Sequence, residues 1–494
     1  MKKILGALAL ALAGIIPIQA QAGPRDNFYW LGQINKATAV INTQQGLLTQ
    51  AQGHKFAQGI AAVLEQGEAP NGKRPVLVTT FEPLLIEAAG PEITMLHAGR
   101  SSQDMLTTVS LAMQREQLLE LAAELNKMQQ TLITLAQTHQ GTIMPNYTNG
   151  VAAQPNSMAH YLLAYCEAFN RDYERLQAFY QRLNRSPMGA TVLNGTGWPL
   201  NRDKMAAYLG FDQLAYNTYD AGQVFPQEAP IELGAISSSI AIHMGSFLEE
   251  LMQQYAQPRP WILLQEGNGN TYASSAMPQK RNPGIINRCR TDCSTILGSA
   301  VQAAFRAHNI PAGMADGRLR GTDSLTKNTI SVVKQFNRIL NALDIRPERA
   351  LEELNLDWTC SQEIADVLMR DYGVPFRAGH HFASEIVTYA RNNNITPKEL
   401  TYEEAAKVYA KLAAEDKALP QAFPMNSQDL AACLDPAAIV ANRAVKGGPQ
   451  PEELTKMLTM ARKNLDAKER WQQEAKQKLK AAEERLNKDF AALL

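Results

Sequence analysis

The chain has few of the residues that build disulfide scaffolds and metal centres. Five cysteines in 494 residues are too sparse, and odd in number, for a disulfide framework. Cys289 and Cys293 are four residues apart, on one face of the segment if it is helical. A metal ion would need further ligands, and no cluster of histidines or cysteines supplies them. We therefore expect no metal, and we expect the cysteines to pack as small buried residues.

The chain also lacks an excess of charge of either sign. It has 48 basic and 48 acidic residues, whereas a nucleic-acid binder usually has a basic excess. The composition therefore argues against a nucleic-acid partner, although it does not exclude a charged pocket. The hydrophobic content of 45% is typical of a folded soluble protein, and 494 residues suffice for two to four domains.

After its first residues the sequence has no apolar run that we expect to span a membrane. At the N-terminus, Lys2 and Lys3 precede an apolar run over residues 4–18, and Ala20-Gln21-Ala22 fits the cleavage rule for secretory signals. We expect a signal peptide over residues 1–22, cut after Ala22, and hence a periplasmic or secreted protein. A membrane anchor is the alternative, but the run is shorter than the roughly 20 residues that a spanning helix needs.

Helical periodicity is abundant. Apolar residues recur at three- and four-residue spacing over residues 106–140, 161–183, 231–255, 285–307 and 325–343. Residues 451–494 predict another long helix with a solvated face, and residues 75–80 are the best strand candidate. The predicted fold class is mainly α. Helices of this length predict a bundle whose apolar surface one chain cannot bury alone, so we expect several subunits to share a helical core.

Residues 274–283, which read SSAMPQKRNP, carry the densest chemistry. Removing a proton beside a carboxylate needs a base in hydrogen-bonding reach and donors aimed at the dianionic intermediate. Ser274 can be that base if a closing loop excludes water and Lys280 stabilises the alkoxide. Asn282 can donate to a carboxylate oxygen. Two further polar clusters, residues 98–104 and 144–155, lie at the ends of long helices, where they can converge with this loop.

These segments resemble the signatures of the fumarase/aspartase superfamily, and in particular its argininosuccinate lyase branch. The matching stretches cover about residues 30–465 and are 95–101 (MLHAGRS), 144–155, 193–212, 274–283, 373–380 (GVPFRAGH) and 434–448. The resemblance implies a mainly α, three-domain fold with a central bundle of long helices. After the signal peptide (residues 1–22), the expected domains are an N-terminal helical domain (23–115), the bundle (116–360) and a C-terminal helical domain (361–494).

The resemblance also implies a homotetramer in which three subunits build each active site. The implied reaction is a reversible β-elimination that breaks a C–N or C–O bond and releases fumarate, without metal or organic cofactor. Ser274 and Lys280 are then the catalytic residues. The implied substrate-binding residues are Ser101, Ser102, Thr148, Asn149, Gln154, Ser275, Asn282 and Asn287.

Departures from the family pattern affect the proton-donating half of the site. Asn149 and Asn287 replace the histidine and the glutamate of the usual proton relay. Two amides can hydrogen-bond each other, so we interpret the pair as a coherent replacement that removes the usual acid. His97 or His160 could supply the proton instead, although His160 is better explained as a structural histidine.

Other departures affect the choice of substrate. Residues 102–104 read Ser-Gln-Asp where the branch has Arg-Asn-Asp, so a charge-pairing arginine is gone. Residues 222–224 replace the branch's Ser-Asp-Arg motif, and Ala273 replaces the glycine before the serines. Argininosuccinate is therefore not the expected substrate, and Arg318 and Arg320 are candidates for new anion contacts.

Three functions remain open at this point. The leading hypothesis is an exported lyase that eliminates an amine or another leaving group from a succinyl-type compound to give fumarate or an analogue. The second is a cycloisomerase on the same scaffold, and the third is a non-catalytic dicarboxylate-binding protein. Product analysis separates the first two, and calorimetry without turnover would identify the third.

Overall fold

Long helices make up most of the described chain. The computed structural model describes residues 23–317, 322–417 and 419–494. The expected signal peptide, Arg318 and Arg320 therefore lie outside the described residues. Backbone contacts divide the chain into two units, of which the first holds the described residues up to Ala98 together with Asp489–Leu494, and the second holds Gly99–Lys488.

The first unit is a small group of helices. These are α1 (Asn27–Gln44), α2 (Gln50–Glu68), α3 (Val78–Ala89) and the 3-10 helix η1 (Pro91–His97). The side chains of Asp26 and Thr49 cap α1 and α2 by accepting hydrogen bonds from backbone N–H groups. The strand predicted over residues 75–80 is wrong, because residues 75–77 are irregular and α3 begins at Val78. Val76 and Leu77 are exposed and pair with no strand in the described part of the chain.

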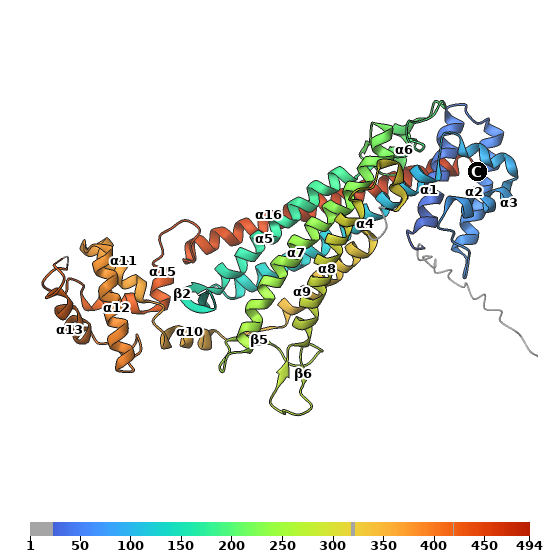
Figure 1. The fold of residues 1–494 in the computed structure, drawn as a ribbon. Helices are drawn as coiled ribbons and strands as arrows, with labels where there is room; N and C mark the ends of the chain where they lie inside the picture. Colours follow the sequence, from blue (N-terminus) through green and yellow to red (C-terminus); the bar gives the residue numbers. More distant parts are fainter. Residues whose placement is uncertain (1–22, 318–321, 418) are drawn as a thin grey trace, which may run out of the picture. The chain divides into compact units, whose positions relative to one another are not determined.

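The second unit is built on a bundle of long helices (Figure 1). Its main members are α4 (Ser102–Thr138), α5 (Met158–Leu183), α7 (Phe225–Tyr255), α8 (Gly284–Ala307) and α9 (Thr322–Asn341). These helices match the five predicted segments to within a few residues and confirm the mainly α fold class. α4 packs against α5 and α9, while α7 packs against α8 and α5. The bundle core includes Phe336, whose ring lies 5.8 Å from Phe169 and 5.4 Å from Phe247.

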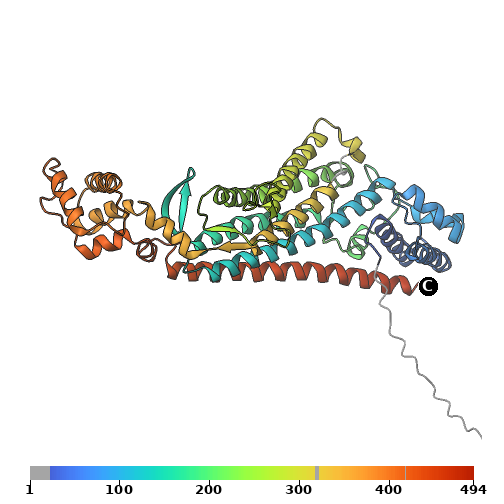
Figure 2. The ribbon, with the colours of Figure 1, turned by 90° about the horizontal axis from the view of Figure 1, so that it is seen from below.

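The last helix, α16 (Pro451–Ala491), lies along α4 and α5 in both views (Figures 1 and 2). The hydroxyl of Tyr173 on α5 donates to the carbonyl of Lys468 at 3.1 Å. The Lys468 ammonium donates to the side-chain oxygen of Gln129 on α4 at 2.7 Å. Burial lowers the pKa of Lys468 to about 8. One face of α16 is thus buried and the other solvated, as predicted for residues 451–494.

Helix α7 corrects one expectation. Together with the π-helical turn η2 (Asp220–Val224) it is long and apolar enough to cross a membrane by length and composition, whereas we expected no such segment after residue 22. Half of its most apolar stretch is buried inside the structure. An all-round apolar helix of this kind is also what the core of a large bundle requires.

The strands pair in twos within the described residues. The pairs are β1 (Ile143–Thr148) with β2 (Val151–Ser157), β3 (Arg185–Ser186) with β4 (Gln213–Leu214), β5 (Ile262–Leu264) with β8 (Leu343–Ile345), and β6 (Tyr272–Ala273) with β7 (Arg281–Asn282). Only β3 and β4 are parallel. The remaining connections contain α6 (Arg202–Tyr208) and the 3-10 helix η3 (Ala312–Gly317). We expected a loop where β1 and β2 form a hairpin, although Asn149-Gly150 between them is a strong hairpin signal.

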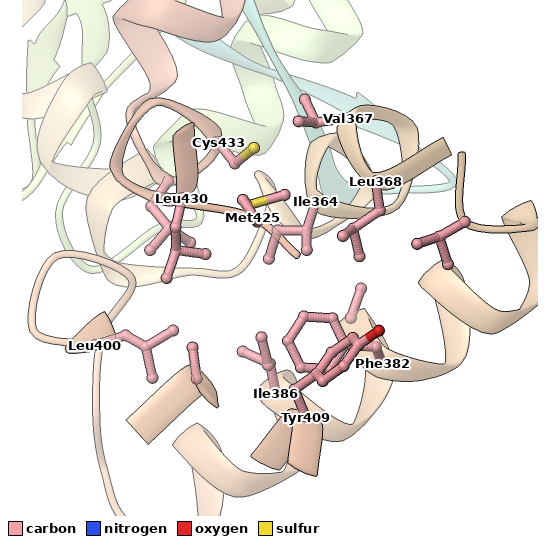
Figure 3. Close-up of a cluster of buried hydrophobic side chains, with 14 of the residues drawn as sticks. Ile364, Val367, Leu368, Phe382, Ile386, Leu400, Tyr409, Met425, Leu430 and Cys433 are labelled. Atoms are coloured by element: carbon pink, nitrogen blue, oxygen red, sulfur yellow. The ribbon is translucent and has the colours of Figure 1, made fainter. Parts of the chain in front are cut away.

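The C-terminal part of the second unit has a hydrophobic core of its own (Figure 3). Its helices are α10 (Pro347–Leu356), α11 (Ser361–Tyr372), α12 (Phe376–Asn392), α13 (Tyr402–Ala413), α14 (Ser427–Leu434) and α15 (Pro436–Ala441). Phe382 and Tyr409 pack edge to face at 5.0 Å in this core. The predicted domain boundary after residue 115 falls inside α4, whereas the contacts begin the second unit at Gly99. The division into three domains remains a prediction.

Candidate active site

The loop that carries Ser274 is the tip of a short β-hairpin. β6 and β7 pair so that Tyr272 faces Asn282 and Ala273 faces Arg281. The backbone N–H of Ser274 donates to the carbonyl of Lys280 at 3.3 Å and closes the loop. Figure 1 shows the hairpin projecting from one end of the bundle, beside β5. The pairing therefore keeps the predicted base, cation and amide on one small loop.

The Ser274 hydroxyl oxygen accepts two backbone hydrogen bonds. The N–H groups of Met277 and Ala276 donate to it at 3.1 and 3.3 Å. Such donors bond more strongly to an alkoxide than to a neutral hydroxyl, so they favour the deprotonated serine. The loop itself therefore supplies part of the stabilisation that a serine base requires.

Lys280 provides a free cation on the same loop. It is exposed, and its ammonium makes no hydrogen bond or ion pair within the described residues. The neighbouring Arg281 is neutralised by Glu266 at 2.8 Å. The side chain of Asn282 donates to the carbonyl of Tyr272 at 3.3 Å, so its amide would exchange this bond for a ligand carboxylate. Ser275 is exposed beside Ser274.

Thr148 and Asn149 lie at the exposed tip of the β1–β2 hairpin. Asn149 and Gly150 both have positive φ angles, 54° and 78°. This is the type I′ turn, for which Asn-Gly is strongly favoured. The turn geometry therefore also favours asparagine at position 149. The family resemblance alone had shown only that Asn149 replaces a relay histidine.

Tyr147 anchors this hairpin, and no sequence signal singled it out. Its hydroxyl donates to the Glu353 carboxylate at 2.6 Å and accepts from the Trp261 indole at 3.0 Å and the Gln254 amide at 3.2 Å. Burial, reinforced by Glu353, raises the pKa of Tyr147 to about 12, so the phenol stays protonated as a donor. Gln154, on β2, donates to Gln362 of α11 at 2.7 Å. It thus joins the hairpin to the C-terminal helices within one chain.

Ser101 and Ser102 open α4 in different environments. Ser101 is the N-cap: its hydroxyl oxygen accepts from the N–H of Gln103 at 3.2 Å, and its own N–H donates to Asp104 at 2.9 Å. Ser102 is exposed, and its hydroxyl makes no hydrogen bond within the described residues. The N-terminus of a long helix favours anions. Ser102 is therefore the serine of this pair that is free to bind a carboxylate.

Asp104 fixes the start of α4 to the loop that contains Gly189 and Thr191. It is fully buried, and its second carboxylate oxygen accepts from the N–H groups of Gly189 and Thr191, each at 3.0 Å. Burial raises the pKa of Asp104 to about 6, against the opposing effect of its N–H donors. The Ser101–Asp104 spacing of a capping box was the sequence signal for this role.

The altered stretch at residues 222–224 contacts this first cluster. The Gln103 amide donates to the carbonyl of Gly222 in the π-helical turn η2, and Gln223 donates to the carbonyl of Val192 at 2.8 Å. π-Helical turns occur mostly as single turns and frequently at functional sites. The residues that replace the branch's Ser-Asp-Arg motif therefore have a structural role beside Ser102.

The expected hydrogen bond between Asn149 and Asn287 does not form within one chain. Asn287 lies exposed on the first turn of α8, and neither side-chain amide has a partner in the described part of the chain. His160 contacts the carbonyl of Gly447 at 3.1 Å, which is a structural role. His97, in the first unit, lies 3.8 Å from Glu82.

The five cysteines are free and buried, which confirms their expected packing. Residues 23–317, 322–417 and 419–494 contain no group of three or more His, Cys, Asp or Glu side chains that could hold a metal ion.

The three polar clusters do not converge in one chain. α4 has 37 residues and separates Ser102 from the hairpin that follows its C-terminal end, and at 1.5 Å per residue it is about 55 Å long. The hairpin at residues 143–157 lies at the same end of the bundle as β5 and β6, as its bonds to Gln254 and Trp261 show (Figure 1). The second and third clusters therefore share one end, and the first lies at the other.

Two family models match the chain. Residues 84–298 match a lyase family, and residues 358–441 match the argininosuccinate lyase C-terminal family. The argininosuccinate lyase of Pelotomaculum thermopropionicum is 29% identical over 428 residues, covering 85% of this chain and 89% of the relative. That of Methanocaldococcus jannaschii is 28% identical over 455 residues, covering 91% and 90%.

Solved structures share the fold. An EDDS lyase in complex with formate superposes with a TM-score of 0.87 at 24% identity, covering 94% of this chain and 92% of that one. A 3-carboxy-cis,cis-muconate lactonizing enzyme from Pseudomonas putida gives a TM-score of 0.64 at 16% identity, covering 90% and 94%. The chain thus has the mainly helical fumarase/aspartase fold. By its family matches and its relatives, the chain is similar to lyases of this superfamily and to argininosuccinate lyases in particular.

Proposed function

We propose that the protein is an exported lyase that eliminates an amine from a succinyl-type compound and releases fumarate. Ser274, as the alkoxide, takes the proton from the carbon beside a carboxylate, the released electron pair forms the C=C bond, and the C–N bond breaks with its electron pair going to the nitrogen. The nitrogen enters the reaction already protonated, so the amine leaves as a neutral molecule without a separate acid. Lys280, Asn282, Ser102 and Thr148 hold the carboxylates and stabilise the dianion. The observation that carries the proposal is the Ser274 hydroxyl, which accepts two backbone N–H groups on the loop that also presents the unpaired Lys280.

The proposal includes a homotetramer with shared sites. The Ser102 cluster and the Ser274 hairpin lie at opposite ends of the bundle. If neighbouring subunits pack antiparallel, the Ser102 cluster of one subunit lies beside the Ser274 hairpin of the next. Large apolar side chains are exposed along α7 and α8, namely Ile231, Ile242, Val301 and Phe305. Exposed apolar patches of this kind mark protein interfaces, which supports subunit contacts along these helices.

Amine addition to fumarate tests the reaction. The purified protein is incubated with fumarate and a panel of amino acids and diamines, and loss of fumarate absorbance is followed. We expect amine-dependent loss with the wild type and at least a 100-fold lower rate with Ser274→Ala, because the base is removed. Ser427→Ala, which removes an exposed serine hydroxyl at the start of α14, is the matched control and should keep the wild-type rate.

Three outcomes would contradict the proposal. Unchanged turnover in Ser274→Ala would exclude this serine as the base. A ring-closed isomer with no released fragment would favour a cycloisomerase, a function to which the Asn149 and Asn287 replacements also point. Tight fumarate binding by calorimetry without conversion of any amine would identify a dicarboxylate-binding protein.

A further inference from the structure

A groove of about 440 Å³ lies between α11 and α12 and shares no residue with the three polar clusters. Arg377, His380 and Ser384 of α12 line it from one side, and Ser361 and Gln362 at the start of α11 line it from the other. The groove lining therefore contains one arginine and no carboxylate, together with side chains that can donate hydrogen bonds, which suits an anion.

The same groove has an apolar stripe. Phe376, Ala383 and Val387 line it, and they recur along α12 at helical spacing. The adjoining face of α12 buries Phe382 and Ile386 in the C-terminal core (Figure 3). The helix that forms the groove wall is therefore held in place by packing.

The charge of the groove is not neutralised. Arg377 is exposed and makes no hydrogen bond or ion pair within the described residues, in the first turn of a helix that has no acidic residue there. Among the charges near the groove, Arg370 pairs with Asp371 at 2.8 Å, and the Asp366 carboxylate, which does not line the groove, accepts a hydrogen bond from the amide of Gln362 at 3.3 Å. A carboxylate in the groove would meet an arginine with its full donor fork available.

We propose that this groove binds a small organic carboxylate with a short apolar body. The carboxylate sits on Arg377, with His380 and Ser384 as further donors. The apolar body lies along Phe376 and Val387. Gln362, at the edge of the groove, accepts from Gln154 of the β1–β2 hairpin at 2.7 Å. The ligand can therefore be the amino-acid half of the substrate or a separate small acid.

Calorimetry with 3-methylbutanoate, and with the uncharged 3-methylbutanamide for comparison, tests the groove in the whole protein. We expect the acid to bind the wild type and to bind Arg377→Gln at least about tenfold more weakly, since a charge-assisted bond is lost. Arg391→Gln, in the last turn of the same helix, removes an equal charge outside the groove and should bind normally. Thermal melting checks that both variants fold. If Arg377→Gln does not fold, His380→Gln tests the groove through its second donor.

Equal binding of the acid by Arg377→Gln, or equal binding of the amide by the wild type, would overturn the proposal. Loss of acid binding in Asn282→Ala would also overturn it, because the acid would then occupy the Ser274 hairpin. Turnover measurements identify the source of the ligand, and this part of the test rests on the proposed function. A raised KM with unchanged kcat in Arg377→Gln identifies the amino-acid half, and unchanged turnover identifies a separate acid. The binding result stands even if no elimination is found.

Discussion

At the residue scale, neighbouring side chains of the same type have separate roles. The Ser101 hydroxyl caps α4, whereas the Ser102 hydroxyl is exposed and unpartnered within the described residues. The Ser274 hydroxyl receives two N–H donors, whereas Ser275 is simply exposed. In each pair of adjacent serines, one hydroxyl is therefore hydrogen-bonded by the local backbone and the other is free within the described residues.

Alanine substitution should separate the two roles at the start of α4. Ser101→Ala removes half of a capping box and should lower the free energy of unfolding by about 1 kcal/mol. Ser102→Ala should change that free energy by less than about 0.5 kcal/mol, yet raise KM for the substrate several-fold, since an exposed ligand-binding hydroxyl is lost. Urea unfolding and steady-state kinetics on both variants measure the difference. Equal stability losses, with KM unchanged in Ser102→Ala, would contradict the assignment.

The sequence predicted a candidate catalytic loop, but it did not predict the backbone contacts that surround it. The Ser274, Lys280 and Asn282 cluster was readable because all three lie within one short loop. The N–H donors to Ser274 and the turn at Asn149 were not, because backbone geometry decides them. Asn149 was first interpreted as a lost histidine, and its positive φ shows that the hairpin turn also favours asparagine.

At the element scale, the β1–β2 hairpin is the part of the site whose position is best defined. Tyr147 holds it against α10 through Glu353, against α7 through Gln254, and against the segment before β5 through Trp261. Because Thr148 follows directly in the same strand, the orientation of Thr148 depends on these bonds.

Tyr147→Phe should loosen the hairpin. It leaves three polar partners unsatisfied, so we expect the free energy of unfolding to fall by about 1–3 kcal/mol. As a positioning residue it should also raise KM several-fold with a smaller change in kcat. Tyr402→Phe, whose hydroxyl donates to the carbonyl of Met425 at 3.0 Å in the C-terminal helices, is the control for loss of a tyrosine hydroxyl. An unchanged KM in Tyr147→Phe would show that the anchor is structural only.

The long helices were predictable because their periodicity extends over many turns. The predicted segment at residues 106–140 is α4, Ser102–Thr138, and the other four agree equally well. The short strands were not predicted, since two- to seven-residue strands leave little alternation to detect. The strand predicted at residues 75–80 was wrong because this apolar run has no pairing strand in the described part of the chain. Its first residues are irregular and the rest begin α3.

At the scale of the whole molecule, the second unit places its polar clusters at two ends of one bundle. A site that needs both Ser102 and Ser274 must therefore draw them from different copies of the chain. The sequence predicted the long helix at residues 106–140, and the family resemblance implied shared sites, but which end of the bundle each cluster occupies follows only from the three-dimensional structure.

Mixing two inactive variants tests this account most directly. Ser102→Asp, whose carboxylate repels a carboxylate of the substrate, and Ser274→Ala, each purified inactive or nearly so, are mixed, dissociated and reassembled, and amine-dependent fumarate loss is measured. If each site takes the two serines from different subunits, random assembly at equal amounts should restore about a quarter of the wild-type activity. Activity that stays at the level of the separate variants, in a mixture shown to contain hybrid oligomers, would contradict a site shared between chains.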